Sequence, residues 1–213
     1  SGMTMTGKFI SLEGTEGVGK STNVAFICTW LAQRQIPFVT TREPGGTGYG
    51  DQIRALLLDV REEALDPLAE LLLIFAARAQ HLAQLIRPAL AAGSWVVCDR
   101  FTDATYAYQG GGRGIDTDSI ATLEHLVQGA LRPDLTLVLD IAPALGLARV
   151  RGRGALDRFE REQLDFFARV RSAYRSRALA APERYRMIDA SRDIAQVQAD
   201  IDQALTAFIA AGS

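Results

Sequence analysis

The chain contains 213 residues, of which 48% are apolar and 23% are charged. This composition suits one globular α/β domain, or one such domain with a small mobile insert, and it excludes an intrinsically disordered chain. The net charge of −2 provides no basic field that could hold a nucleic-acid polymer. No apolar run reaches the roughly 18 residues that a membrane span needs, so we expect no membrane partner.

The N-terminus and the cysteines favour a cytoplasmic location. The N-terminus lacks the basic region and apolar run of a secretory signal, and Ser1 and Gly2 resemble a cloning scar. Cys28 and Cys98 lie far apart in the sequence and have no metal-ligand spacing. We expect both to be buried free thiols, which fits a reducing compartment.

In chain order, short apolar runs rich in β-forming residues alternate with longer helical patterns. The short runs predict strands at Lys8–Glu13, Phe38–Thr41, Trp95–Asp99, Leu135–Asp140 and Tyr185–Asp189. The intervening patterns predict helices near 19–34, 47–59, 67–91, 117–130, 143–152, 160–180 and 193–210. Such alternation indicates a parallel sheet that is covered by helices on both faces.

We therefore predict a single domain over residues 1–213 with a three-layer α/β/α fold around a five-stranded parallel sheet. Continuous apolar strands such as LTLVL agree with a sheet that is buried on both faces. Ligands of such a sheet bind beyond the carboxyl ends of its strands. The polar residues of interest follow the predicted strands at Glu13–Gly19, Arg42–Gly46, Asp99–Phe101 and Asp140.

A phosphate-binding pattern follows the first predicted strand. Residues 14–22 read GTEGVGKST and match G-x-x-x-x-G-K-[ST]. Glycines let backbone N–H groups turn inward around phosphates, and the positive end of the next helix points at the same phosphates. Lys20 can then reach the β- and γ-phosphates, and the Ser21 hydroxyl can hold Mg²⁺. The pattern predicts a P-loop that binds ATP through Gly14, Thr15, Glu16, Gly17, Val18, Gly19, Lys20, Ser21 and Thr22.

A P-loop indicates a nucleoside triphosphate but not a reaction. A GTPase would carry an N-K-x-D segment that reads guanine, but Asn23 is the only asparagine and no lysine follows Lys20. An ATPase motor usually has a strand that ends in Asp-Glu, whereas these strands end in Asp99-Arg100 and Asp140-Ile141. An arginine directly after the strand-end acid suits a second phosphate-bearing substrate better than a hydrolytic water.

Four further segments resemble a known family when they are taken together with the P-loop. They are TREPGGT at 41–47, FAARAQH at 75–81, DRF at 99–101 and AYQGGGRG at 107–114. The set is similar to bacterial thymidylate kinase, a P-loop nucleoside monophosphate kinase family, from Phe9 to about Ser191. The resemblance implies transfer of the γ-phosphate of ATP to dTMP, giving dTDP and ADP in dTTP biosynthesis.

The resemblance also implies roles at the phosphate end of the acceptor. Asp99 would help to hold the hydration shell of Mg²⁺, and Arg100 and Arg54 would contact the acceptor phosphate, which guanidinium groups grip in a bidentate way. Glu43 would orient Arg100 or a metal-bound water, and Glu16 would lie near the 3′-hydroxyl of dTMP. A structural salt bridge for Arg100, and exposed surface positions for Arg54 and Glu16, stay open as alternatives.

At the base, the family roles fall on residues of two segments. Arg78 matches the arginine to O4 of thymine, Gln109 matches the amide that faces N3, and Thr105 belongs to the same lining. Tyr108 matches the residue under the deoxyribose, where its ring would crowd a 2′-hydroxyl at a cost of about 1–3 kcal/mol.

The aromatic residue that stacks on thymine in the family has no direct counterpart. Its position is Ile74 here, and the aromatic residue is Phe75, one place later. On a helix this shift turns the side chain by about 100°. We favour Phe75 as the residue that stacks on the base, with Ile74 as the alternative and core packing open for both.

Residues 149–158 read RVRGRGALDR and combine arginines with hinge-like glycines. The segment resembles the LID of the family, which closes over ATP, and we place it at about 147–160. Arg153 is the first candidate for the arginine that stabilises the transition state, followed by Arg149 and then Arg158. Arg149 and Arg153 are also expected to bind ATP.

Catalysis of this kind needs no general base, because the phosphate oxygen of dTMP is already anionic. We expect alignment, Mg²⁺ and the groups of Lys20, Asp99, Arg100 and Arg153 to carry the reaction, with His81 in a structural role. The family commonly forms homodimers, and the apolar stretch Leu68–Ala79 either contributes to that interface or is simply buried.

Two other functions stay open from the sequence. A kinase for another nucleoside monophosphate would share the same build and differ only in its acceptor. A nucleotide-dependent switch or partner-binding protein would hydrolyse ATP slowly, and its release of ADP would not depend on any acceptor.

Overall fold

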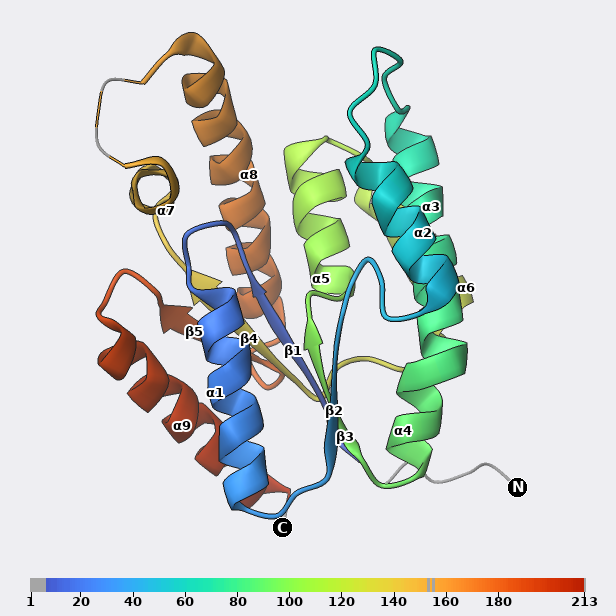
Figure 1. The fold of residues 1–213 in the computed structure, drawn as a ribbon, viewed down its shortest axis with the longest axis vertical. Helices are drawn as coiled ribbons and strands as arrows, with labels where there is room; N and C mark the ends of the chain where they lie inside the picture. The colour runs from blue at the N-terminus through green and yellow to red at the C-terminus, as the bar shows by residue number, and fades with distance from the viewer. Residues whose placement is uncertain (1–6, 153, 155, 213) are drawn as a thin grey trace.

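The computed structural model describes residues 7–152, 154 and 156–212, and within them five parallel strands form one sheet (Figure 1). The spatial order is β2-β3-β1-β4-β5. The strands are β1 (Phe9–Gly14), β2 (Phe38–Arg42), β3 (Trp95–Asp99), β4 (Leu135–Asp140) and β5 (Tyr185–Asp189). All five predicted strands are confirmed to within one residue at each end. The suggested scar at Ser1 and Gly2 lies outside the described residues.

The helices cover both faces of this sheet, as the three-layer prediction required. They are α1 (Lys20–Gln33), α2 (Gly48–Leu58), α3 (Pro67–His81), α4 (Arg87–Ala91), α5 (Thr102–Thr105), α6 (Thr117–Gln128), α7 (Pro143–Arg151), α8 (Arg158–Ala180) and α9 (Ile194–Ala211). Two wider π-helical segments are η1 (Leu82–Ile86), between α3 and α4, and η2 (Tyr106–Gly112), directly after α5.

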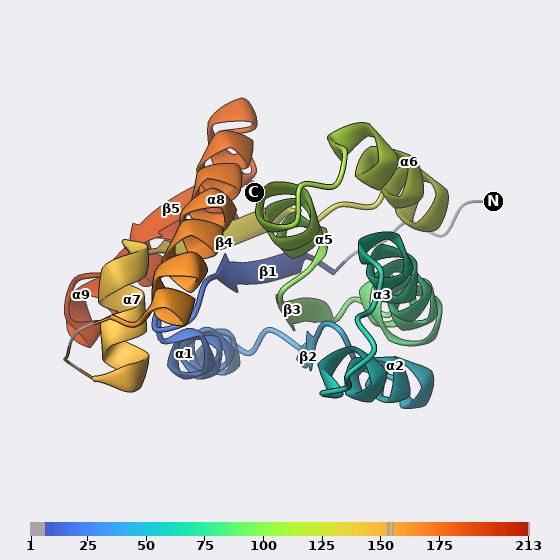
Figure 2. The ribbon, with the colours of Figure 1, turned by 90° about the horizontal axis from the view of Figure 1, so that it is seen from above.

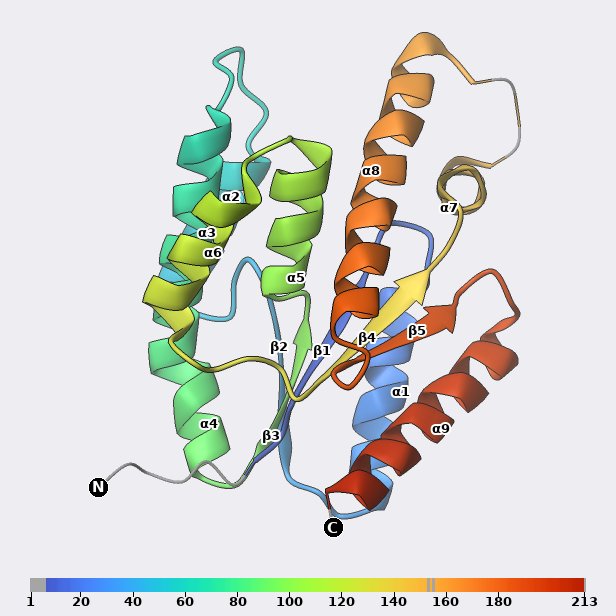
Figure 3. The same ribbon diagram turned by 180° about the vertical axis from the view of Figure 1, so that it is seen from behind.

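Successive residues of the buried strands pack against opposite faces of the sheet. In β1, Ile10 and Leu12 pack with Ile27 and Leu31 of α1 and with the apolar face of α9. Phe9 points the other way and packs with η1 and α4. Figure 2 shows α1 and α9 on one side of the sheet and α8 on the other, and Figure 3 shows α5 and α8 side by side. Every residue of β1 is buried, as expected for a parallel sheet between two helical layers.

The strand register gathers the polar strand ends at one edge of the sheet. Asp99 is the partner of both Leu12 in β1 and Arg42 in β2, and Gly14 pairs with Leu139 in β4. The residues that follow these positions in the chain therefore emerge together. This edge carries the site described below.

One helical segment was missed from the sequence, namely α5 with η2 at Thr102–Gly112. Its AYQGGG run argues against a helix, because glycine is a poor helix former. The structure explains the glycines by the close approach of α8. A Cβ atom at Gly112 would lie 2.4 Å from the ring of Phe166, and one at Gly111 would lie 2.9 Å from the backbone oxygen of Arg169.

Among the described residues, the stretch Pro67–Ala91 alone has the length and apolar composition that could cross a membrane. Leu82, Ile86 and Leu90 of this stretch are buried against β1 and β3. Packing in the core is a sufficient reason for its apolar composition, since core helices pass the same test.

Candidate active site

The P-loop forms a cavity between β1 and α1. Gly17 and Gly19 have φ angles of 78° and 76°, which glycine adopts without strain. A Cβ atom at Gly17 would also lie 2.3 Å from the backbone oxygen of Gly146 in α7, so the loop packs directly on that helix. The cavity measures about 430 Å³ and is lined by Thr15, Glu16, Gly17, Val18, Gly19, Lys20, Ser21, Arg100 and Val150.

Lys20 reaches from the start of α1 to the end of β3. Its Nζ atom lies 2.6 Å from Asp99 Oδ1. Burial lowers the pKa of Lys20, and the nearby positive charge of Arg100 lowers it further, against the opposing effect of Asp99. The P-loop cation and the strand-end acid are thus brought together, as predicted.

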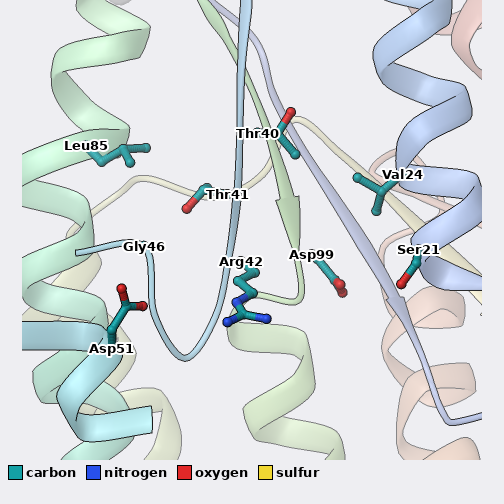
Figure 4. A pocket seen from close by; sticks show the side chains of 9 residues that line it. All are labelled: Ser21, Val24, Thr40, Thr41, Arg42, Gly46, Asp51, Leu85 and Asp99. Atoms are coloured by element: carbon teal, nitrogen blue, oxygen red, sulfur yellow. The ribbon is translucent and has the colours of Figure 1, made fainter. Parts of the chain in front are cut away.

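Ser21 and Asp99 line a second cavity of about 550 Å³ beside the P-loop. In Figure 4 the Asp99 side chain of β3 lies between the Arg42 side chain of β2 and the Ser21 side chain of α1. The described residues contain no group of three or more His, Cys, Asp or Glu side chains that could hold a metal. Mg²⁺ needs no such cage, because it binds through one or two protein oxygens, water and substrate phosphates. The hydroxyl of Ser21 and the carboxylate of Asp99 fit that requirement.

A third cavity lies between α3 and the α5–η2 segment, and it measures about 240 Å³. Its lining includes Arg78, Thr105, Tyr108 and Gln109, the four residues that the resemblance assigned to the base and sugar of the acceptor. It also includes Arg100, which lines the P-loop cavity as well. We call it the acceptor cavity. Its complete lining is Glu43, Pro44, Leu57, Leu58, Glu70, Ile74, Arg78, Arg100, Phe101, Ala104, Thr105, Tyr108, Gln109 and Arg113.

Arg100 stands where the two cavities meet, in an unusual backbone conformation. Its φ angle is 67°, a left-handed value that is costly for a residue with a side chain and is often found at functional sites. Its Nη2 atom donates to Gly14 O at 3.3 Å and to Tyr108 Oη at 3.1 Å. Its Nε atom is buried without a hydrogen-bond partner in the described part of the chain. A buried donor of this kind fits an anionic ligand.

Two more arginines lie close to Arg100. Burial lowers the pKa of Arg54, and the charges of Arg42 and Arg100 lower it further. Arg54 also donates to Pro44 O at 3.0 Å, although it is not part of the acceptor-cavity lining. Arg54 of α2 is thus close to the cations at the carboxyl ends of β2 and β3, and three neighbouring cations suit a polyanionic ligand.

Glu43 lines the acceptor cavity, but its carboxylate contacts Arg78 and not the expected Arg100. Its Oε1 atom accepts from Arg78 Nε at 2.6 Å, and its Oε2 atom lies 2.7 Å from His81 Nδ1. Arg78 also donates through Nη1 to Thr105 Oγ1 at 3.0 Å. Glu43 therefore orients Arg78 and not Arg100. His81, which is fully buried and also contacts Thr41, holds the Glu43 carboxylate in place.

The structure also corrects the expectation for Phe75. This residue is 2% exposed and packs with Leu71, Tyr106 and Ile120 in the core. Ile74, one residue earlier, lines the acceptor cavity. The face of α3 that packs on α6 and η2 takes the aromatic ring, so the aliphatic alternative is the one that faces the ligand space.

Glu16 is exposed and lines the P-loop cavity, not the acceptor cavity. Its charge nevertheless acts on Tyr108, whose pKa is raised mainly by burial and to a lesser extent by Glu13 and Glu16. The carboxylate therefore lies near the border between the two spaces. This position is compatible with the expected contact to a sugar hydroxyl.

In the predicted LID, Arg149 and Arg158 are described and Arg153 lies outside the described residues. Arg149 of α7 donates to the backbone oxygens of Ala190, Ser191 and Gly17, at 2.6, 2.9 and 3.3 Å. This places it beside the P-loop. Arg158 is highly exposed and lies 3.4 Å from Glu162 on the first turns of α8.

Sequence reasoning placed Glu13, the last residue before the P-loop, at the edge of the site but assigned it no role. Its side chain is fully buried; Oε1 accepts from Phe101 N and Oε2 from Tyr174 Oη, both at 2.7 Å. It thereby ties β1 to the backbone that follows Arg100 and to α8. In the sequence, the only sign of this role was that Glu13 ends the apolar run FISLE. An acid at that position is equally expected where a strand gives way to a loop.

Burial is the main cause that raises the pKa of Glu13, from 4.5 to about 8, and the charge of Asp103 adds to it. The folded protein therefore binds this proton more tightly than the unfolded chain does. The resulting stabilisation is complete below pH 4.5 and is lost as the pH rises to about 8. Glutamine could still accept from Phe101 N through its amide oxygen, and its amide nitrogen could donate to Tyr174 Oη. Replacing Glu13 with glutamine should therefore remove this loss.

We expect the free energy of unfolding of Glu13→Gln, relative to the parent, to increase between pH 5 and pH 8 in urea titrations. Glu162→Gln, at an exposed site, serves as the control and should follow the parent. Parallel curves for Glu13→Gln and the parent would show that Glu13 titrates normally in the fold.

The comparisons with known proteins agree with this geometry. A family model described as thymidylate kinase matches residues 12–201. The chain is 61% identical over 205 residues to a thymidylate kinase of Teredinibacter turnerae, covering 96% of this chain and 100% of that protein. It is 58% identical over 207 residues to a thymidylate kinase of Ectopseudomonas mendocina, covering 97% and 99%. A crystal structure of thymidylate kinase from Ehrlichia chaffeensis, 33% identical, superposes with a TM-score of 0.77 over 94% of this chain and 98% of that chain. The chain belongs to the thymidylate kinase family.

Proposed function

We propose that ATP binds in the P-loop cavity and dTMP in the acceptor cavity, with their phosphates facing each other at Arg100. The reaction is the phosphorylation of dTMP to dTDP, with ATP as the donor of the γ-phosphate. The observation that carries this arrangement is that Arg100 lines both cavities. Two polyanions that meet at one point need a cation between them, and Arg100 supplies it with an unused buried donor.

The residues of this chain act mainly by position and charge. Lys20 would leave Asp99 in part to contact the β- and γ-phosphates, while backbone N–H groups of the P-loop hold the same oxygens. Arg100, with Arg42 and Arg54 nearby, would hold the dTMP phosphate in line with the γ-phosphate. No side chain needs to remove a proton, because the attacking phosphate oxygen is already ionised near neutral pH.

We also propose that Ser21 and Asp99 hold Mg²⁺ together with the ATP phosphates. The cation, when bound, would neutralise charge on the β- and γ-phosphates. The donor set of one hydroxyl and one carboxylate beside the P-loop supports this assignment.

The LID remains a proposal that rests on its place next to the P-loop. Val150 lines the P-loop cavity, and Arg149 donates to Gly17 O. A segment so close to the phosphates can supply a cation during transfer and exclude water. Arg153 stays our first candidate for that cation from the sequence, with Arg149 and Arg158 after it.

We propose a homodimer formed by the outer faces of α3 and α6, which pack against each other within the chain. Leu68, Leu72 and Leu126 on these helices are apolar side chains with roughly half or more of their surface exposed. Burying such side chains in a second copy would remove them from water. Sedimentation equilibrium that detects only monomer at micromolar concentration would reject this part of the proposal.

A cytoplasmic location is also a proposal. Cys28 and Cys98 are both free thiols, as expected for a reducing compartment. The expectation that both are buried is correct for Cys98 and wrong for Cys28, which is partly exposed near Thr40.

The direct test is a coupled assay of ADP release with each nucleoside monophosphate in turn. We expect release to depend on dTMP, with dUMP as a weaker acceptor and with purine monophosphates inactive. Omission of Mg²⁺ should abolish the signal. ADP release that is indifferent to dTMP, together with no measurable dTMP binding by calorimetry, would reject the arrangement.

A further inference from the structure

The amide of Gln109 can present either of two opposite groups to the acceptor cavity. Its oxygen accepts hydrogen bonds and its nitrogen donates them, and only its partners determine which end faces a ligand. Gln109 is 9% exposed and belongs to η2, in the lining of the cavity. The orientation of this single amide therefore decides which pyrimidine edge the site can accept.

Glu70, in the first turn of α3, contacts this amide. Its Oε1 atom accepts from Gln109 Nε2 at 2.8 Å. An ionised carboxylate can only accept, so it selects the amide nitrogen and leaves the amide oxygen for the cavity. Glu70 is itself held by Arg113, whose Nε lies 3.4 Å from the same oxygen.

Arg78 provides the complementary group. Its Nε and Nη1 atoms are engaged by Glu43 and Thr105, and neither contact uses Nη2. The cavity thus offers an acceptor from Gln109 beside a donor from Arg78. Thymine and uracil present the matching pair, a donor at N3 and an acceptor at O4. Cytosine presents the reverse, an acceptor at N3 and a donor at N4.

We propose that Glu70 is a specificity-determining positioning residue, which fixes the Gln109 amide so that the site accepts thymine and uracil and rejects cytosine. The inference rests on the proposed binding of dTMP in the acceptor cavity. Glu70 acts through Gln109 and lies at the rim of the cavity, since its side chain is 16% exposed. Without it, the amide can turn and offer its nitrogen to N3 of cytosine.

The test compares kcat/KM for dTMP, dUMP and dCMP in the parent and in Glu70→Ala. Loss of one oriented hydrogen bond should lower kcat/KM for dTMP by about tenfold, chiefly through KM. The value for dCMP should stay or rise, so the dTMP/dCMP ratio narrows by about tenfold or more. The dTMP/dUMP ratio should not change, because both bases share the same edge.

If Glu70 had only a structural role, Glu70→Ala would lower kcat/KM by the same factor for all three substrates. An unchanged ratio of kcat/KM for dTMP to that for dCMP would therefore overturn the proposal. Glu62→Ala, which removes an exposed acid from the loop before α3, is the matched control for charge and should leave all ratios unchanged. If the parent enzyme fails to use dTMP at all, it is the proposed function that fails, and not the role of Glu70.

A double-mutant cycle with Gln109→Ala separates positioning from other effects. Once Gln109 is absent, Glu70→Ala should no longer alter the dTMP/dCMP ratio. A further change in the ratio in that background would overturn the proposal. If Glu70→Ala does not fold, Glu70→Gln replaces it in the double-mutant cycle. The amide of glutamine can either accept from Gln109 or donate to it, so it would orient Gln109 only in part. We expect an intermediate ratio for Glu70→Gln, and a ratio equal to that of the parent would contradict the proposal.

Discussion

Replacing Lys20 with alanine should lower kcat by about 10²–10³-fold or more, while the fold and dTMP binding persist. Lys20 is the only lysine at the P-loop. Its positive charge stabilises the transition state, in which negative charge shifts between the phosphates during transfer. Steady-state kinetics with saturating dTMP would measure the effect, and calorimetry would measure dTMP affinity separately.

The chain offers a matched control for this substitution. Lys8 is the only other lysine; it is exposed and lies just before the amino end of β1, the opposite edge of the sheet from the site. Lys8→Ala removes the same group and should leave kcat unchanged. Lys20 is paired with Asp99, whose carboxylate is partly exposed, so water can solvate that carboxylate once Lys20 is replaced and the fold should persist. Near-parental kcat in Lys20→Ala would reject the ATP assignment of the P-loop.

The parts of the site that could be predicted from the sequence depend on local order along the chain. A strand, a glycine turn and a helix in direct succession produce the P-loop whatever surrounds them, and Lys20 and Ser21 follow from that order. Asp99 and Arg100 follow from the end of an apolar strand in a parallel sheet. Sites of this kind can be predicted once the alternation of strands and helices is assigned correctly.

The parts that were wrong or missed depend on packing between distant elements. The helical segment Thr102–Gly112 has weak local propensity, and it exists because α8, more than fifty residues later, approaches its glycines closely. The choice between Ile74 and Phe75 depends on which face of α3 meets α6 and η2. Glu13 acquires its role from Tyr174, which is 161 residues away in the chain. No periodicity in one segment could reveal these contacts.

Replacing Arg100 with alanine is the second change with a large expected effect. Arg100 lines both cavities, so its loss should raise KM for dTMP and also lower kcat, with kcat/KM down by about 10³-fold or more. Arg100→Lys keeps the charge but loses the bidentate fork, and should fall between the parent and Arg100→Ala. Arg61→Ala, at an exposed loop arginine, should leave both constants unchanged.

The backbone at Arg100 allows the charge to be separated from strain. At a φ angle of 67°, alanine keeps the conformational cost of a Cβ atom, whereas glycine removes about 1 kcal/mol of it. Arg100→Gly should therefore be more stable than Arg100→Ala in urea unfolding, yet equally poor in kcat/KM. Equal activity with unequal stability would assign the catalytic loss to the guanidinium group itself. If Arg100→Gly instead recovers activity in step with stability, the loss in Arg100→Ala reflects a distorted loop, and a direct role for Arg100 between the two phosphates is rejected.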